Sequence, residues 1–246
     1  MPEARPVERA GPPQRGRGEL GLRVLSALVL APLAIGTAYL GGVVFIAFWL
    51  IASLGVLWEW IALVRGATER SRMQRAAWIA LGLLYAGTLF AAPLVIRVDA
   101  ERGFLAMIYL FLVVWGTDIA AYFAGRALGG PKLCPAVSPN KTWSGALGGS
   151  AAAIVVGLIV AVAAGIGALG AIALLSLGLS IASQIGDLVE SALKRRFGAK
   201  DAGHLIPGHG GLMDRLDGFL TAALAAALVG AARGGIDEAA RGLLVW

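Results

Sequence analysis

The densest group of polar side chains in the sequence lies in residues 186–218, between two apolar stretches. On a helix, Asp187, Ser191 and Lys194 share one face, because they are separated by four and three residues. Arg195 follows Asp187 at an offset of eight and joins that face. The face would then carry a carboxylate, a hydroxyl group and two cations, a combination that suits a phosphorylated ligand.

Two further acids, Asp214 and Asp217, are three residues apart and would also share a helix face. Carboxylate oxygens are ligands that Mg2+ prefers, and nearby lysines and arginines neutralise the remaining phosphate charge. A substrate that carries several phosphates with its magnesium ions would therefore suit this stretch. The alternative is an ordinary basic loop, in which the acids only form ion pairs with neighbouring bases.

A second polar cluster begins at Asp118, near the end of an apolar stretch, and Tyr122 and Arg126 follow at offsets of four and eight. It continues in the sequence SPNKTWSG at residues 138–145. An ionisable side chain inside a membrane span is functional by default, because its burial in lipid is costly. The alternative is that Asp118 pairs with a nearby cation and only closes a helix bundle. The predicted topology places Asp118 and Asp187 at the same membrane face, so we expect the two clusters to converge.

The sequence lacks the motifs of several other enzyme classes. His204 and His209 do not have the spacing of paired zinc ligands, and no GxSxG or HExxH motif occurs. The phosphate-binding P-loop motif is also missing, so a nucleotide must be held in another way. Gly210 and Gly211, which follow His209, could let backbone N–H groups approach a phosphate, and a flexible turn is the equal alternative.

Glu59 and Trp60 lie at the end of another apolar stretch. We interpret them as an acid that extends toward water beside a tryptophan at the membrane interface. This interpretation is favoured over a catalytic role for Glu59.

The composition is typical of a membrane protein. The 246 residues are 58% apolar, have a mean hydropathy of +0.78 and include only 15% charged residues, against about 25% in soluble domains. The net charge of +6 does not indicate a nucleic-acid partner, because the basic residues flank apolar segments, where they set orientation. The 35 glycines favour helices in close contact, and Gly145 and Gly149 have one such small-residue spacing.

The apolar stretches predict an all-α, polytopic bundle of transmembrane helices with about seven spans, within a range of roughly six to nine. The predicted spans are 22–40, 43–64, 76–96, 103–125, 144–165, 167–187 and 217–233. The predicted domains are a disordered basic tail at 1–18, amino-terminal transmembrane helices at 19–100, a catalytic transmembrane domain with cytoplasmic loops at 101–234, and a short tail at 235–246.

The basic residues predict a cytoplasmic amino terminus. With seven spans, the cytoplasmic regions are 1–23, 65–75, 124–143 and 188–216. These regions hold 17 of the 21 Lys and Arg residues, as the positive-inside rule requires. We therefore expect the site to face the cytosol. The lack of an organelle-targeting pattern and the compact length favour an integral protein of a bacterial inner membrane.

The polar residues resemble those of a known family, the phosphatidate cytidylyltransferases, also called CDP-diacylglycerol synthases. The residues that meet the fixed places of its carboxy-terminal signature are Ser191, Leu193, Lys194, Arg195, Lys200, Asp201, His209, Gly210, Gly211, Asp214, Arg215 and Asp217. The upstream residues that resemble the family are Asp118, Ala121, Tyr122, Gly125, Ser138, Pro139, Lys141 and Thr142. Ser144 departs from the pattern, because many members carry an acid or an amide there, and the chain is shorter than typical members before residue 100.

The resemblance implies a nucleotidyltransferase of phospholipid biosynthesis that makes CDP-diacylglycerol and pyrophosphate from CTP and phosphatidate, with Mg2+ as cofactor. The metal ligands that it implies are Asp118, Asp187, Asp214 and Asp217, and the catalytic residues are these four together with Lys194. The substrate-binding residues that it implies are Tyr122, Ser138, Lys141, Thr142, Ser191, Arg195, Lys200, Asp201, His209, Gly210, Gly211 and Arg215. A second cation and pairing into a homodimer are left open.

Two other functions stay open on the sequence. A CTP-dependent polyprenol or phytol kinase would transfer the γ-phosphoryl group to an alcohol and release CDP instead of pyrophosphate. A transporter would use the charged loops as gates. A CDP-alcohol phosphotransferase is disfavoured, because its Asp-Gly-x2-Ala-Arg opening is absent around Asp217 and Gly218.

Overall fold

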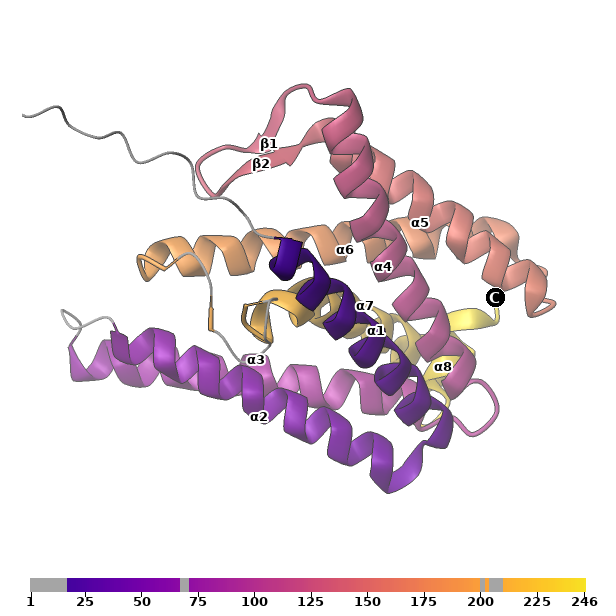
Figure 1. The fold of residues 1–246 in the computed structure, drawn as a ribbon. Coiled ribbons are helices and arrows are strands. Elements are labelled where there is room, and N and C mark those ends of the chain that lie inside the picture. The colour runs from indigo at the N-terminus through magenta and orange to yellow at the C-terminus, as the bar shows by residue number, and fades with distance from the viewer. Residues whose placement is uncertain (1–16, 67–70, 200–201, 204–209) are drawn as a thin grey trace, which may run out of the picture.

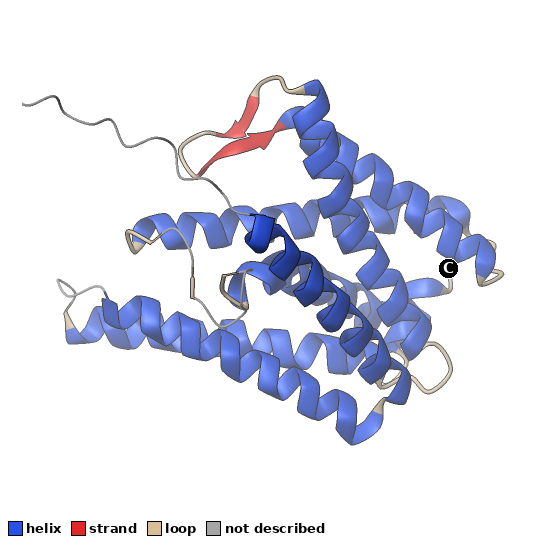
Figure 2. Ribbon diagram, viewed as in Figure 1, coloured by secondary structure: helices blue, strands red, loops and turns tan. Residues whose placement is uncertain are grey.

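The computed structural model describes residues 17–66, 71–199, 202–203 and 210–246, and their side chains from residue 28 onward. These residues form eight helices and one two-stranded hairpin (Figure 1). Helices make up nearly all of the regular structure (Figure 2). The predicted all-α helix bundle is therefore confirmed.

The helices are α1 (Arg17–Leu40), α2 (Gly42–Gly66), α3 (Arg72–Arg97), α4 (Gly103–Leu128), α5 (Trp143–Ala163), α6 (Leu169–Arg196), α7 (Met213–Gly234) and α8 (Ala239–Leu244). The hairpin pairs β1 (Lys132–Cys134) with β2 (Ser138–Thr142) in antiparallel fashion. Within the described ranges, the six helices α2 to α7 are long and apolar enough to cross a membrane. The chain is an integral membrane protein, and six candidate spans fall within the predicted range. The described apolar part of α1, Leu28–Leu40, is shorter, and the orientation of the amino terminus stays a prediction.

Two helices extend beyond the predicted membrane spans at the site. α6 continues past residue 187 to Arg196, and α7 begins at Met213, before residue 217. Asp187 and Lys194 therefore share one helix, and so do Asp214 and Asp217, as the spacing argument supposed. The physical reason is that a helix can continue beyond the lipid, where water and neighbouring charges satisfy its polar side chains.

Small residues bring α4 and α5 into close contact. A methyl group at Gly145 would lie 2.8 Å from the carbonyl oxygen of Ala121, and one at Gly149 would lie 2.8 Å from that of Thr117. The predicted small-residue contact is thus confirmed. It holds the start of α5, and the hairpin that precedes α5, against the carboxy-terminal half of α4.

Aromatic rings join α2, α4 and α7 in the core. Trp49 of α2 stacks on Phe219 of α7 with ring centroids 4.9 Å apart, and Phe111 of α4 packs against Phe219 at 5.4 Å. Trp60 of α2 is only 3% exposed and donates a hydrogen bond of 2.8 Å from Nε1 to the carbonyl oxygen of Trp78. Trp60 is therefore buried inside the bundle, where α3 satisfies its polar edge, and its depth in the membrane stays a prediction.

Candidate active site

Two glycines bring α6 and α7 together beside the predicted site residues. A methyl group at Gly186 would lie 2.6 Å from the carbonyl oxygen of Asp217, and one at Gly218 would lie 2.6 Å from Ser183 Oγ. The hydroxyl group of Thr221 donates a hydrogen bond of 2.8 Å to an α6 carbonyl oxygen at the same crossing. The two backbones can touch because neither glycine has a side chain.

The carboxyl groups of Asp187 and Asp217 face each other across this crossing. Asp217 is 9% exposed, and its Oδ1 accepts a hydrogen bond of 2.7 Å from the N–H of Gly218. Asp187 lies beside it, because Asp187 Oδ1 is 3.4 Å from where a methyl group at Gly218 would lie, and the two carboxyl groups are within electrostatic range of each other. Two ionised carboxylates this close repel each other, so the arrangement favours a proton or a cation between them.

The hairpin brings a cation to this pair. Lys141 Nζ of β2 lies 2.6 Å from Asp187 Oδ2, and the two side chains are 30% and 29% exposed. Thr142 caps α5 by accepting a hydrogen bond of 3.1 Å from the N–H of Gly145, which fixes the end of β2. The contact between Lys141 and Asp187 confirms that the two polar clusters of the sequence converge.

A second lysine lies between two further acids. Lys194 Nζ is 2.8 Å from Glu190 Oε2 and 2.6 Å from Asp214 Oδ1. Glu190 is 2% exposed, and its Oε1 has no hydrogen-bond partner among the described residues. Sequence reasoning missed Glu190, although its spacing of three from Asp187 and four from Lys194 places it on the same helix face. One lysine cannot neutralise two carboxylates, so this cluster keeps excess negative charge when both are ionised.

Asp214 also anchors the chain that leads into α7. Its Oδ2 accepts hydrogen bonds from the N–H groups of Ala202 at 3.2 Å and Gly211 at 3.0 Å. The N–H of Gly211, a predicted phosphate contact, is therefore directed at a carboxylate of the protein itself. Gly210 has a φ of 83°, a backbone conformation that favours glycine, so the turn before α7 depends on this residue type.

Glu59 of α2 binds the backbone at the amino-terminal end of α7. It is 2% exposed, and its carboxylate accepts hydrogen bonds from the N–H groups of Leu212 at 2.9 Å and Met213 at 2.8 Å. The interpretation of Glu59 as an acid that extends toward water is wrong, because these backbone donors hold it inside the protein. No local pattern could have revealed the contact, because its partners lie 153 and 154 residues away along the chain.

Asp118 lies at the same end of the bundle as the α6–α7 crossing. Its carboxyl group is within electrostatic range of Asp187, Lys141 and Arg215. Tyr85 of α3, which the sequence did not single out, is within electrostatic range of the acids on α6 and α7. Direct contacts therefore join charged side chains of β2, α6 and α7, and Asp118 of α4 and Tyr85 of α3 lie within electrostatic range of them.

Comparisons with known proteins identify the class to which this site belongs. Residues 67–232 match the model of the cytidylyltransferase family. The chain is 42% identical to the phosphatidate cytidylyltransferase of Brucella suis, over 86% of this chain and 93% of that protein. It is 43% identical to the phosphatidate cytidylyltransferase of Bacillus subtilis, over 58% of this chain and 54% of that protein. The chain belongs to the cytidylyltransferase family.

Membership of the cytidylyltransferase family confirms the predicted family and enzyme class, a nucleotidyltransferase. The predicted site residues that direct contacts join are Lys141 with Asp187 and Lys194 with Asp214. Those within electrostatic range of this group are Asp118, Arg215 and Asp217, of which Asp118 and Arg215 are exposed. The family match begins at residue 67, so Glu59 lies outside the matched segment.

The remaining predicted substrate-binding residues of this cytidylyltransferase differ in how exposed they are. Those that are half-buried are Ser138 and Ser191, and those that are exposed are Tyr122 and Arg195. Tyr122 is 59% exposed, and its hydroxyl oxygen accepts a hydrogen bond of 2.9 Å from Arg126. Ser144, where the sequence departs from the family pattern, donates a hydrogen bond to the carbonyl oxygen of Gly129 and ties α5 to the end of α4. Three predicted site residues lie outside the described ranges, namely Lys200, Asp201 and His209.

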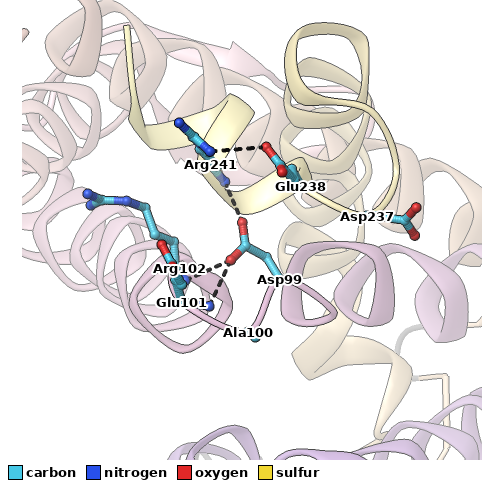
Figure 3. Close-up of a pocket in the computed structure, with 7 residues that line it drawn as sticks. All are labelled: Asp99, Ala100, Glu101, Arg102, Asp237, Glu238 and Arg241. Atoms are coloured by element: carbon cyan, nitrogen blue, oxygen red, sulfur yellow. Dashed lines mark hydrogen bonds and ion pairs between the residues drawn. The ribbon is translucent and has the colours of Figure 1, made fainter.

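A pocket of about 220 Å3 lies at the other end of the cytidylyltransferase bundle. It is formed by the turn between α3 and α4 and by residues at and before α8 (Figure 3). Gly103 begins α4 at this pocket, and Asp118 lies about 22 Å further along the helix at 1.5 Å per residue. This pocket is therefore separate from the candidate active site.

Proposed function

We propose that this cytidylyltransferase transfers the cytidylyl group of CTP to phosphatidate, which yields CDP-diacylglycerol and pyrophosphate in phospholipid biosynthesis. The observation that carries the proposal is the pair of opposed carboxyl groups, Asp187 and Asp217, together with Lys141 and Lys194 at the ends of apolar helices. The relatives named phosphatidate cytidylyltransferase support the choice of both substrates.

Magnesium is the proposed cofactor. Within the described part of the chain, no group of three or more His, Cys, Asp or Glu side chains is arranged to hold a metal ion. Magnesium commonly takes only one or two protein carboxylates and completes its octahedral shell with water and substrate phosphates. Asp187 and Asp217 offer such a pair, so their donor chemistry fits an ion that arrives with the nucleotide. Asp118 and Asp214 are further candidate ligands, and a second cation is part of the same proposal.

The proposed reaction depends on positioning and charge neutralisation more than on proton transfer. A phosphatidate oxygen, already ionised at neutral pH, attacks the α-phosphorus of CTP. The bond between that phosphorus and the oxygen leading to the β-phosphate breaks, and pyrophosphate leaves. Lys141 and Lys194 would hold phosphate oxygens, and bound magnesium would supply further charge neutralisation.

The place of these residues in the bundle suits a water-soluble substrate and a lipid. They lie at the ends of helices whose apolar lengths match the hydrocarbon layer, so CTP can arrive from water while the acyl chains stay in lipid. We also propose that the protein lies in a bacterial inner membrane with the site facing the cytosol, and the distribution of basic residues supports this orientation. Pairing into a homodimer is also proposed, and the mass of the detergent-solubilised protein tests it.

The reaction is tested with purified protein in detergent, phosphatidate, and CTP labelled at either the α- or the γ-phosphate. Cytidylyl transfer moves the α-label into the lipid extract and the γ-label into pyrophosphate, and chelation of Mg2+ stops both. If a parallel reaction with a polyprenol in place of phosphatidate moves the γ-label into the lipid and releases CDP, the protein is a lipid kinase and the proposal is wrong.

The same purified protein also tests the transporter alternative. If neither label changes compound with phosphatidate and Mg2+ present, while protein in liposomes carries a solute across the bilayer, the charged residues belong to a transport path.

A further inference from the structure

The amino-terminal end of α7 is held by a residue from the other half of the chain. The first N–H groups of a helix have no partner within the helix and need acceptors from elsewhere. Glu59 accepts from Leu212 at 2.9 Å and from Met213 at 2.8 Å. Asp214 accepts from the preceding N–H, that of Gly211, at 3.0 Å. Two carboxylates therefore satisfy three successive backbone donors.

The backbone closes tightly around the Glu59 carboxylate. A methyl group at Gly203 would lie 2.5 Å from Glu59 Oε1, and one at Gly211 would lie 2.9 Å from Glu59 Oε2. Two chain segments that precede α7 thus touch this one side chain. A larger or displaced group at position 59 would have to move the backbone that leads into the site.

The first turn of α7 is also the turn that carries site residues. Met213 is followed directly by Asp214, and Asp217 lies about one helical turn further on. Any displacement of this turn therefore changes where Asp217 lies relative to Asp187 on α6. A misplacement of about 1 Å can reduce an enzyme's rate about 100-fold.

We propose that Glu59 is a positioning residue of the active site, which sets the distance between Asp217 and Asp187 by holding the N–H groups of Leu212 and Met213. The segment that matches the family model does not contain Glu59, so the amino-terminal half of the chain supplies a part of the site's framework. The kinetic part of the test rests on the proposed cytidylyl transfer, and the exchange measurement below does not.

The first test compares Glu59→Ala and Glu59→Gln with the unaltered protein. Glu59→Ala removes both acceptors, and we expect kcat to fall about 10- to 100-fold, with a higher Mg2+ concentration at half-maximal rate. Glu59→Gln keeps one acceptor oxygen and the side-chain volume but presents a donor to the second N–H. We expect it to lie between the other two proteins, so a folded variant is available even if Glu59→Ala is unstable.

Trp49→Leu is the matched control. It loosens packing between the same two helices by removing the ring that stacks on Phe219 at 4.9 Å, but it does not touch the first turn of α7. We expect a lower unfolding temperature with kcat and Mg2+ dependence near those of the unaltered protein. If Glu59→Gln and Trp49→Leu lose activity only in proportion to their unfolding temperatures, Glu59 has a general structural role and the proposal is wrong.

Hydrogen exchange measures the contact itself. The amides of Leu212 and Met213 should exchange slowly in the unaltered protein and in Trp49→Leu, and faster in both Glu59 variants. Unchanged exchange in Glu59→Gln and Glu59→Ala would overturn the proposal. If the proposed function is wrong, the unaltered protein makes no CDP-diacylglycerol, but the amides of Leu212 and Met213 still exchange faster in the Glu59 variants. The two failures can therefore be told apart.

Discussion

Two acidic regions at opposite ends of the bundle use their carboxylates differently. At the α3–α4 turn, Asp99 is 7% exposed and accepts hydrogen bonds from the N–H groups of Glu101, Arg102 and Arg241 at 3.0, 2.8 and 3.0 Å (Figure 3). Both of its oxygens are used, and they tie the start of α4 to α8. Hydrogen bonds within the protein thus use both oxygens of Asp99.

The α6–α7 crossing is the opposite case. Asp217 faces another carboxyl group, that of Asp187, and Glu190 keeps one buried oxygen without a partner in the described part of the chain. Lys141 and Lys194 offset only part of the negative charge. Buried acids alone therefore do not mark a functional site. Acids that lie close together and whose charge neighbouring lysines offset only in part are a stronger indication, because proteins tolerate the cost of such repulsion mainly at functional sites.

The substitution Asp217→Asn is the strongest test of the difference between the two ends of the bundle. The substitution keeps the shape of the side chain but weakens cation binding, so we expect turnover to fall about 1,000-fold or more. It also relieves repulsion with Asp187, so the unfolding temperature in detergent should stay the same or rise. Turnover near the unaltered value, or a clearly lower unfolding temperature, would place Asp217 in the same structural class as Asp99.

A smaller loss is expected from Lys141→Ala. It removes the cation 2.6 Å from Asp187, and we expect turnover to fall about 100-fold, with partial recovery in Lys141→Arg. The control is Arg241→Ala, which removes a cation from an exposed pair with Glu238 and should leave turnover unchanged. Equal effects of the two alanine variants on steady-state turnover would contradict the distinction between the two ends.

Gly218→Ala tests whether the crossing sets the geometry of the acids. The added methyl group would lie 2.6 Å from Ser183 Oγ and 3.2 Å from the carbonyl oxygen of Ser183, so the serine must rotate and the helices must shift by a few tenths of an ångström, at a cost of about 1–3 kcal/mol in stability. We expect turnover to fall about tenfold. Gly178→Ala is the control on α6, because nothing lies within 4 Å of its methyl group. Thermal unfolding and turnover of both variants should show an effect of Gly218→Ala alone.

The smallest effect on turnover is expected from Asp99→Asn, the counterpart of Asp217→Asn at the satisfied end. It places an amide donor where a carboxylate oxygen accepted from a backbone N–H, at a cost of about 1–3 kcal/mol in stability. The unfolding temperature should therefore fall while turnover is kept. A large loss of turnover at an unchanged unfolding temperature would show that this end takes part in the reaction.

Much of the site could be predicted from local patterns. Spacing placed Asp187 and Lys194 on one helix face, and the motif that ends at Asp217 carried the family resemblance that the comparisons confirm. Glu190 was within reach of the same spacing argument and was missed. The helix ends at Arg196 and Met213 were not predicted, because hydropathy detects where a helix leaves the lipid and not where its hydrogen bonds stop.

The sequence by itself determined the membrane helices, the enzyme family and most of the charged residues at the site. Each of these depends on composition or on spacings of a few residues. Only the tertiary structure decided that Lys141 meets Asp187, and that Glu59 holds the start of α7 from 153 residues away. The physical reason is that such contacts depend on how helices cross. Glycine contacts and buried hydrogen bonds set those crossings between segments that no local pattern connects.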